Sequence, residues 1–316
     1  MRLYDNFGRP LLNLRISVTQ QCNYNCTYCH REGETKQVNT TADNTACIEM
    51  TSDEIVHLAK LAINLGVTRI KLTGGEPLMR HDICQIVAGI AGLSGLKDLS
   101  LTTNGYMLSD TAKALHDAGL SRVNISLASL NPKTYQTITG GNVDKTLAGV
   151  KAAVNAGFNP VKLNMVLLKD VNTSDVSDMI TYAEKMGAVL QLIELDPVNV
   201  SSTYYRQYHY NLEAQEELLR QKAIYTEQRQ FMHNRIIYHL PNVNVEVVHP
   251  IENTDFCMHC TRLRITSDGK LKPCLMHNSK LTDILTPMRQ GANDEKLEQL
   301  FKQANQLREP YNKNNN

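Results

Sequence analysis

The sequence lacks the features that would direct the protein to a membrane, a secretory route or nucleic acid. No run approaches about 18 consecutive apolar residues, the length of a membrane-spanning helix. The first twelve residues include Arg2, Asp5 and Arg9 among scattered apolar residues, unlike a signal or transit peptide. The formal net charge of +1 is too small to attract polyanions. We therefore expect a cytoplasmic protein with a local small-molecule pocket, and neither nucleic acid nor a membrane as partner.

A phosphate-binding loop is also missing. The chain contains no segment of the form G-x-x-x-x-G-K-[S/T], whose backbone N–H groups cradle phosphates in many nucleotide-binding proteins. Any nucleotide must therefore be held by side chains.

The pattern of apolar residues predicts an α/β fold. Thr51 and Glu54 form a capping-box sequence at the start of one expected helix, which ends at Gly66. Six successive strand-then-helix units predict a parallel sheet curled into a partial (βα)6 barrel of the TIM type. The expected strands are residues 14–18, 69–73, 99–102, 123–127, 161–168 and 189–194, and the expected helices lie near residues 51–65, 82–91, 109–118, 143–156 and 174–186.

The pattern changes after Asp196-Pro197, where we expect the barrel to end. This predicts a barrel core over residues 1–197 and a C-terminal extension over residues 198–316 that packs back on the barrel. The extension has a tyrosine-rich stretch at 204–210, for which docking under a loop is favoured over stacking on a base. A long polar helix near 212–232 and a helical tail near 294–307 are expected to follow. Residues 32–45 are expected to form a polar surface loop, and residues 312–316 a frayed end.

Eight cysteines are present, and six fall into two triplets. In a reducing compartment they are expected to be metal ligands or core residues rather than disulfides. Cys47 and Cys84 stand apart and receive no role.

The first triplet, Cys22, Cys26 and Cys29, follows the first expected strand, where a parallel barrel presents its chemistry. Three thiolates are one short of the four that complete a [4Fe–4S] cluster, which leaves one iron open to a substrate. A zinc site completed by His30 is the alternative.

The second triplet, Cys257, Cys260 and Cys274, is incomplete in the same way. On spacing alone, a zinc site completed by His259 or His277 is as good an interpretation as a cluster.

Three motifs at the ends of successive expected strands resemble those of the radical SAM (S-adenosylmethionine) superfamily. They are the Cys-x3-Cys-x2-Cys loop with Tyr28 before its last cysteine, Gly74-Gly75-Glu76-Pro77, and Thr102-Thr103-Asn104-Gly105; Ser126 lies in the fourth strand. The resemblance implies a [4Fe–4S] cluster on the first triplet and SAM bound by Tyr28, Gly75 and Ser126. It also implies an external electron donor and a 5′-deoxyadenosyl radical, with no side chain acting as catalytic acid or base.

The second triplet, with the Arg-x-Arg pair at 262 and 264, resembles the auxiliary-cluster segment of the MoaA family of GTP 3′,8-cyclases, and residues 7–10 and 14–19 are also similar to that family. The resemblance implies a second [4Fe–4S] cluster and a lyase that converts GTP to (8S)-3′,8-cyclo-7,8-dihydroguanosine 5′-triphosphate, in the first step of molybdenum cofactor biosynthesis. A cyclic pyranopterin monophosphate synthase would act downstream, and a homodimer is one oligomeric state that the resemblance allows. The implied GTP-binding residues are Arg15, Lys71, Thr102, Lys162, Arg262 and Arg264.

Two departures from the bacterial pattern keep alternatives open. Bacterial members commonly end in a Gly-Gly tail that enters the active site, whereas this sequence reads Arg308-Glu309-Pro310 and onward to Asn316, and His30-Arg31 stands in place of a common Met-Pro, as in the archaeal-type branch. The alternatives are another two-cluster radical SAM enzyme that acts on a peptide or a different nucleotide, and a non-catalytic zinc-binding protein.

Overall fold

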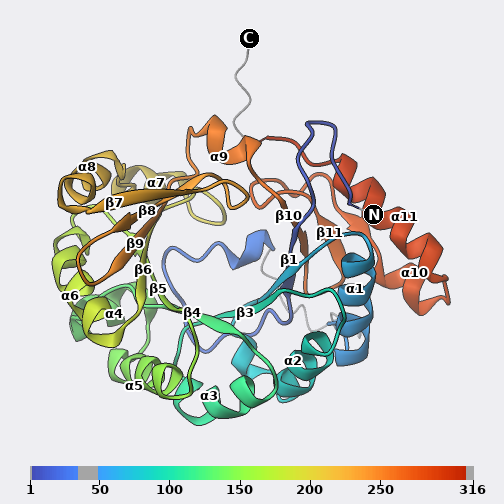
Figure 1. The fold of residues 1–316 in the computed structure, drawn as a ribbon, viewed down its shortest axis with the longest axis horizontal. Helices are drawn as coiled ribbons and strands as arrows, with labels where there is room; N and C mark the ends of the chain where they lie inside the picture. Colours follow the sequence, from blue (N-terminus) through green and yellow to red (C-terminus); the bar gives the residue numbers. More distant parts are fainter. Residues whose placement is uncertain (1, 35–48, 311–316) are drawn as a thin grey trace.

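A single curved sheet of twelve strands is the framework of the protein (Figure 1). The structure, a computed structural model, describes residues 2–34 and 49–310. The six expected strands are present, adjacent in sequence order and parallel. They are β1 (Asn13–Ser17), β2 (Arg69–Thr73), β3 (Asp98–Thr103), β4 (Arg122–Ser126), β5 (Val161–Leu167) and β6 (Val189–Glu194). The predicted α/β class and its six parallel strands are confirmed.

Helices cover the outer face of this sheet (Figure 1). The five expected helices are present, and the capping box of Thr51 and Glu54 is formed at the first of them. One further helix, which begins at Pro132 with Asn131 as its N-cap, was not expected. The helices are α1 (Ser52–Asn64), α2 (Ile83–Ala91), α3 (Leu108–Asp117), α4 (Pro132–Thr139), α5 (Val143–Asn155) and α6 (Val176–Met186), with single 3-10 turns η1 (Arg31–Gly33), η2 (Pro77–Met79) and η3 (Thr173–Asp175).

The sheet does not end with β6. Strand β9 (Asn244–Val248) pairs parallel to β6, and β10 (Arg262–Ile265) pairs parallel to β1, so the C-terminal part adds one parallel strand to each edge of the six. These two strands lie outside the (βα) alternation, which is why the helix periodicity did not reveal them. The division at residue 197 stays a prediction, and the parallel sheet extends beyond it.

The predicted long helix over residues 212–232 is wrong. Over these residues the chain instead forms one shorter helix, which ends at Lys222, and then the first strand of an antiparallel hairpin whose second strand pairs with β9. Tyr225 and Thr226 favour a strand locally, and pairing with the sheet decides the outcome. The elements are α7 (Ser202–Tyr208), α8 (Glu213–Lys222), β7 (Tyr225–Arg229) and β8 (Arg235–His239).

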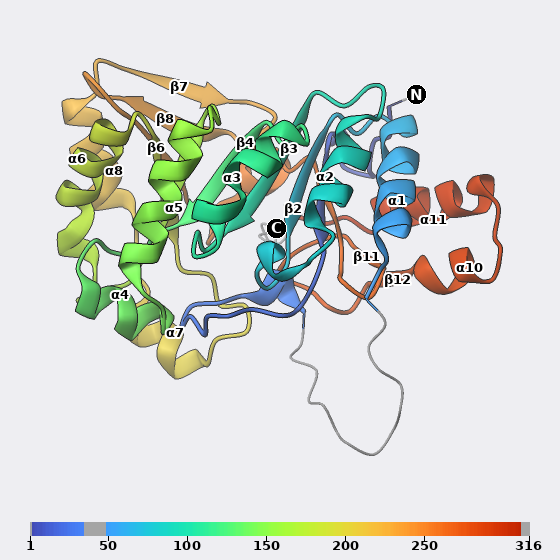
Figure 2. The same cartoon turned by 90° about the horizontal axis from the view of Figure 1, so that it is seen from below.

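The remaining C-terminal elements are α9 (Thr254–Met258), β11 (Lys270–Lys272), β12 (Thr282–Asp283), α10 (Leu285–Arg289) and α11 (Asp294–Gln306). The expected helical tail is therefore confirmed as α11. Figure 2 shows α10 and α11 on the α1 side of the molecule, where Arg289 pairs with Glu54 at 2.7 Å and His57 contacts Asp294 at 2.7 Å.

The expected surface loop at 32–45 lies largely outside the described residues, as do Cys47 and the expected frayed end. Within its described part, Glu32 and Glu34 are only 8% and 7% exposed. This part of the prediction is therefore wrong, because both carboxylates are buried among polar partners. In the described residues, no helix combines the length and apolar character needed to cross a membrane.

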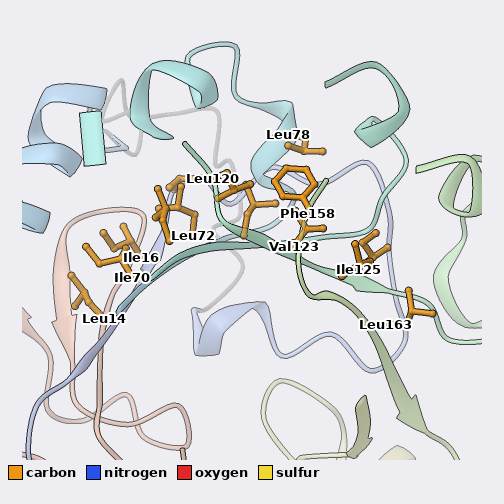
Figure 3. Packing of buried hydrophobic residues seen from close by; sticks show 14 of the residues in the cluster. Leu14, Ile16, Ile70, Leu72, Leu78, Leu120, Val123, Ile125, Phe158 and Leu163 are labelled. Carbon is orange, nitrogen blue, oxygen red and sulfur yellow. The ribbon is translucent and has the colours of Figure 1, made fainter. Parts of the chain in front are cut away.

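The strands alternate between apolar residues that face the helices and polar residues that face the lumen. In β1, for example, Ile16 is fully buried in the apolar core, whereas Arg15 lines the cavity inside the sheet. Figure 3 shows the core residues of β1, β2, β4 and β5 packed together with Leu78, Leu120 and Phe158. The outer core therefore holds the fold, and the polar lumen is left for chemistry.

Replacing Ile16, a fully buried residue of β1 that does not line the cavity, tests whether the outer core holds the fold. Ile16→Ala should lower the free energy of unfolding by about 2–5 kcal/mol, and Ile16→Val by about 0.5–1.5 kcal/mol, because the loss scales with the cavity created. Urea denaturation followed by circular dichroism measures both. Equal, small effects of the two variants would contradict the assigned packing.

Candidate active site

The sheet encloses a cavity of about 350 Å3, and all fifteen predicted site residues line it. They are Cys22, Cys26, Cys29, Cys257, Cys260, Cys274, Tyr28, Gly75, Ser126, Arg15, Lys71, Thr102, Lys162, Arg262 and Arg264. The structure thus brings together residues that lie up to about 260 positions apart in the chain.

The first cysteine loop follows β1 and crosses the opening of the curved sheet (Figure 1). Tyr24 anchors it with edge-to-face ring contacts to Tyr106 and Tyr135, at centroid distances of 6.1 and 6.3 Å. The Tyr204 hydroxyl donates a hydrogen bond to Thr27 Oγ1 at 2.7 Å, so α7 docks under this loop, as the tyrosine-rich stretch predicted. The loop is therefore held from both sides of the opening.

The Gly-Gly pair after β2 exists because the chain passes against the cysteine loop. The Gly75 N–H donates to Thr19 O at 2.7 Å, and the Glu76 N–H donates to Gln21 O at 2.7 Å. A Cβ atom on Gly75 would lie 2.1 Å from Gln21 O, which no side chain can accept. Glycine is therefore required at position 75, because its backbone lies against that of Gln21, the residue before Cys22.

Glu76 connects the three strand-end motifs. Its carboxylate accepts hydrogen bonds from Thr103 Oγ1 at 2.7 Å and from the Asn104 N–H at 2.6 Å, and Asn104 in turn donates to Asn23 Oδ1 at 2.7 Å. Burial raises the pKa of Glu76 to about 7, against the opposing effect of these donors. The residue thus fixes the relative positions of the β2 and β3 turns and the cysteine loop.

The second triplet lies at the opposite end of the sheet from the first. Cys22, Cys26 and Cys29 follow the carboxyl end of β1, whereas Cys257 and Cys260 precede the amino end of the parallel strand β10. Strand β11 runs antiparallel to β10 and returns Cys274 to that same end. The two triplets therefore face the lumen from its two ends, separated by strands of four or five residues, or about 16 Å.

The donor set of each triplet fits a [4Fe–4S] cluster with one open iron, because three free thiols line the cavity at each site. Burial and the neighbouring thiols of Cys29 and Cys22 raise the pKa of Cys26 to about 12, so the three thiols of the first triplet lie close together. In a cluster each thiolate binds a different iron, whereas the ligands of a zinc ion converge on one point at about 2.3 Å.

The second triplet has a positive environment. Burial opposes ionisation of Cys260, but the guanidinium groups of Arg308, Arg262 and Arg9 outweigh it and lower the pKa of this thiol. Deprotonated thiolates are the form that binds metal. The described residues beside the C-terminus, Arg308 and Glu309, also line the cavity.

Strand register aligns the predicted phosphate-binding cations. Arg15 on β1 is the direct partner of Arg264 on β10 and of Lys71 on β2. On the other side of the lumen, Lys162 on β5 is the partner of Asn124 on β4. Because all these positions face inward, the charges form a belt around the lumen between the two cysteine triplets.

Glu32, which sequence reasoning missed, balances part of this belt. Its carboxylate accepts from Arg15 Nη1 at 3.1 Å and also pairs with Arg264. Burial opposes ionisation, but Arg15 and Arg264 outweigh it and lower the pKa of Glu32 to about 2. Arg15 Nε is buried without a hydrogen-bond partner, so the belt retains unused donor capacity.

Glu246 balances the charge of Lys162 on the other side of the lumen, and the sequence analysis missed this residue too. It is fully buried and pairs with Lys162, with Arg229 at 3.1 Å and with Arg235 at 3.3 Å. Despite its burial, these cations hold the pKa of Glu246 far below its usual range. The alternation of polar and apolar residues along the strands was a signal that could have identified Glu246.

Comparisons with known proteins agree with this arrangement. The model of the radical SAM superfamily matches residues 16–183, and the model named Molybdenum Cofactor Synthesis C matches residues 188–314. A crystal structure of Streptococcus suis SuiB bound to S-adenosylmethionine superposes with a TM-score of 0.61 at 15% identity, covering 88% of this chain and 62% of that one, which shows a shared fold.

Full-length relatives narrow the assignment. The chain is 48% identical to a "Probable GTP 3′,8-cyclase" of Thermococcus kodakarensis, over 98% of this chain and 99% of the relative. It is 42% identical to a protein of the same name from Methanocaldococcus jannaschii, over 97% and 98% of the two chains. The chain therefore belongs to the radical SAM superfamily and, within it, to the family of GTP 3′,8-cyclases.

Gly75→Ala should displace the first cysteine loop, since the added Cβ meets the backbone oxygens of Gln21 and Gln20. After reconstitution with iron and sulfide, we expect iron content to fall from about eight toward about four per chain and SAM binding to be lost. Gly92→Ala is the control, because its Cβ would meet nothing closer than 3.5 Å. Full iron content and normal SAM affinity in Gly75→Ala would contradict the close approach.

Proposed function

We propose that this protein is a GTP 3′,8-cyclase that converts GTP to (8S)-3′,8-cyclo-7,8-dihydroguanosine 5′-triphosphate, the first step of molybdenum cofactor biosynthesis. The observation that carries the proposal is the belt of in-register cations between two cysteine triplets at opposite ends of one lumen. It is further supported by full-length relatives with this name.

In this proposal the cysteine triplets have distinct tasks. Cys22, Cys26 and Cys29 hold a [4Fe–4S] cluster beside SAM, and Cys257, Cys260 and Cys274 hold the second cluster near the substrate base. When bound, the first cluster and SAM would supply the radical chemistry needed at C3′ of GTP. Placement of the triplets at the two ends of the lumen supports a substrate bound between them.

The residues that would hold SAM lie at the carboxyl ends of the strands. Gly75 follows β2 and Ser126 ends β4, while Tyr28 projects from the cysteine loop and lines the same cavity. Backbone at Gly75 can approach a ligand closely because it has no side chain. These positions support a SAM site next to the first triplet.

The residues that would hold GTP are Arg15, Lys71, Thr102, Lys162, Arg262 and Arg264. A triphosphate carries about four negative charges, and guanidinium groups pair with phosphate oxygens through two parallel hydrogen bonds. Lys71, which is partly buried, donates a hydrogen bond to Asn124 Oδ1 at 2.9 Å. Desolvation together with the charges of Arg122 and Arg15 holds the pKa of its ammonium group well below its usual range. An anionic ligand would relieve this repulsion, and that supports phosphate binding here.

The proposal extends to partners and location. An external electron donor must reduce the first cluster, a cyclic pyranopterin monophosphate synthase would consume the product, and a homodimer stays a prediction of the family resemblance. The seven described cysteines are all free thiols, which supports a reducing, cytoplasmic compartment.

Anaerobic turnover tests the proposed function. The reconstituted protein with GTP, SAM and dithionite should yield 5′-deoxyadenosine and a cyclised nucleotide with the mass of GTP, identified by liquid chromatography and mass spectrometry. Cys26→Ala should abolish both products, whereas Cys84→Ala, outside the cavity on α2, should not. Formation of 5′-deoxyadenosine without a GTP-derived product would overturn the substrate assignment and leave the superfamily intact.

Opposite effects of two substitutions test the cation belt. Arg264→Gln should weaken GTP binding by about tenfold or more, since a charged hydrogen bond contributes about 1.5–3 kcal/mol. Glu32→Gln should tighten it several-fold, because the carboxylate that competes for Arg15 and Arg264 is neutralised.

Calorimetry of GTP binding to the reconstituted protein, without reductant, measures both effects. Arg289→Gln is the control, because its ion pair with Glu54 lies outside the cavity. Unchanged affinity in Arg264→Gln would contradict its assigned contact with the triphosphate.

A further inference from the structure

Two arginines near opposite ends of the chain converge on the second cysteine triplet. Arg9 belongs to the Phe7-Gly8-Arg9-Pro10 segment that precedes β1, and Arg308 follows α11. They are only 4% and 1% exposed, and both line the cavity. Buried arginines are rare because a buried guanidinium group needs a partner for its charge and for its donors.

Each arginine holds the backbone of one cysteine. Arg9 Nη1 donates a hydrogen bond to Cys257 O at 2.8 Å, and Arg308 Nη2 donates to Cys260 O. Cys257 and Cys260 form one turn, in which the Cys260 N–H donates to Cys257 O at 3.1 Å. The two guanidinium groups therefore clamp both ends of the turn that carries two of the three thiols.

A single carboxylate sits between them. Asp5 pairs with Arg9 Nε at 2.8 Å and lies 3.5 Å from Arg308 Nη1, and its side chain is fully buried. Arg308 Nη1 also donates to Asn305 Oδ1 at 3.0 Å. Two positive charges thus share one negative charge, which leaves a buried positive excess beside the thiols.

Both guanidinium groups also have an unused donor. Arg9 Nη2 and Arg308 Nε are buried atoms with no hydrogen-bond partner. Leaving a buried charged donor unpaired is costly, so such atoms indicate a missing acceptor. A [4Fe–4S] core of formal charge +2 with three thiolates carries a net charge of about −1 and exposes sulfur acceptors. The surplus positive charge and the two unpaired donors therefore match the negative charge and the sulfur acceptors that a cluster at this triplet would supply.

We propose that Arg9 and Arg308 are positioning residues for the second cluster: they clamp the Cys257–Cys260 turn, and their free N–H groups and surplus positive charge stabilise the cluster in its reduced form. The inference rests on the second cluster and does not depend on GTP being the substrate. It gives a physical role to the Phe7–Pro10 segment and to the chain that follows α11.

Electron paramagnetic resonance with potentiometry tests the proposal on the full-length reconstituted protein. A background with Cys22, Cys26 and Cys29 replaced by alanine leaves the second cluster as the one observed. In that background Arg308→Met, which removes the charge at similar length, should shift the midpoint potential to a more negative value, because the reduced cluster gains negative charge. Arg308→Lys, which keeps the positive charge but loses the planar guanidinium group, should shift the midpoint potential less. Arg9→Met should shift the potential in the same direction as Arg308→Met.

The control is Arg220→Met on the surface of α8, where the arginine pairs with Glu217. It should leave potential and iron content unchanged. An unchanged potential in both Arg308→Met and Arg9→Met, with full iron content, would overturn the proposal.

A second measurement applies if the variants lose the cluster and its potential cannot be measured. The melting temperatures of iron-loaded and iron-free protein, with the first triplet intact, are compared for the wild type and for Arg308→Met. The proposal expects the stabilisation that accompanies iron loading to be smaller in Arg308→Met, since the arginine acts on the cluster. If the variant lowers both melting temperatures equally, the arginine has a merely structural role and the proposal is wrong.

Discussion

Positive charge inside the curved sheet is the constraint on which the rest of the structure depends. Arg15, Lys71 and Arg264 lie side by side because parallel strands in register bring their inward positions together. Buried cations are costly unless they are paired. Glu32 and Glu246 supply much of the compensation, from a turn after the first cysteine loop and from a C-terminal strand. The lumen that results is polar, partly balanced and still positive, which suits an anionic substrate.

The same sheet explains why two incomplete cysteine triplets can serve one cavity. Parallel pairing of β1 with β10 places a loop that follows one strand and a turn that precedes the other at opposite ends of the lumen. Each triplet is then stabilised by different means. Tyrosine rings and the Glu76 hydrogen bonds hold the first loop, whereas Arg9 and Arg308 hold the second turn. Opposite placement with independent support is what a substrate held between two clusters requires.

Much of the fold and site could be predicted from local pattern. The six strands, five helices and the capping box at Thr51 follow from periodicity and end signals, which act over a few residues. The motif residues were all found to line one cavity. Glu32 was missed because it belongs to a polar segment that looks like solvent-exposed loop, and β7 because the strand exists only through its pairing with β8.

The sequence by itself predicted the class of the protein through the resemblance of its cysteine spacing and strand-end motifs to the radical SAM superfamily, because such motifs are local and can be read in order along the chain. Tertiary structure decided which charges balance each other. Asp5 pairs with its near neighbour Arg9, but Arg308 lies about 300 residues further along the chain and reaches Asp5 only in the folded structure. Burial then turns ordinary surface residue types into an obligatory network, because unpaired charge away from water is costly. That energetic condition depends on the whole fold and has no local signature.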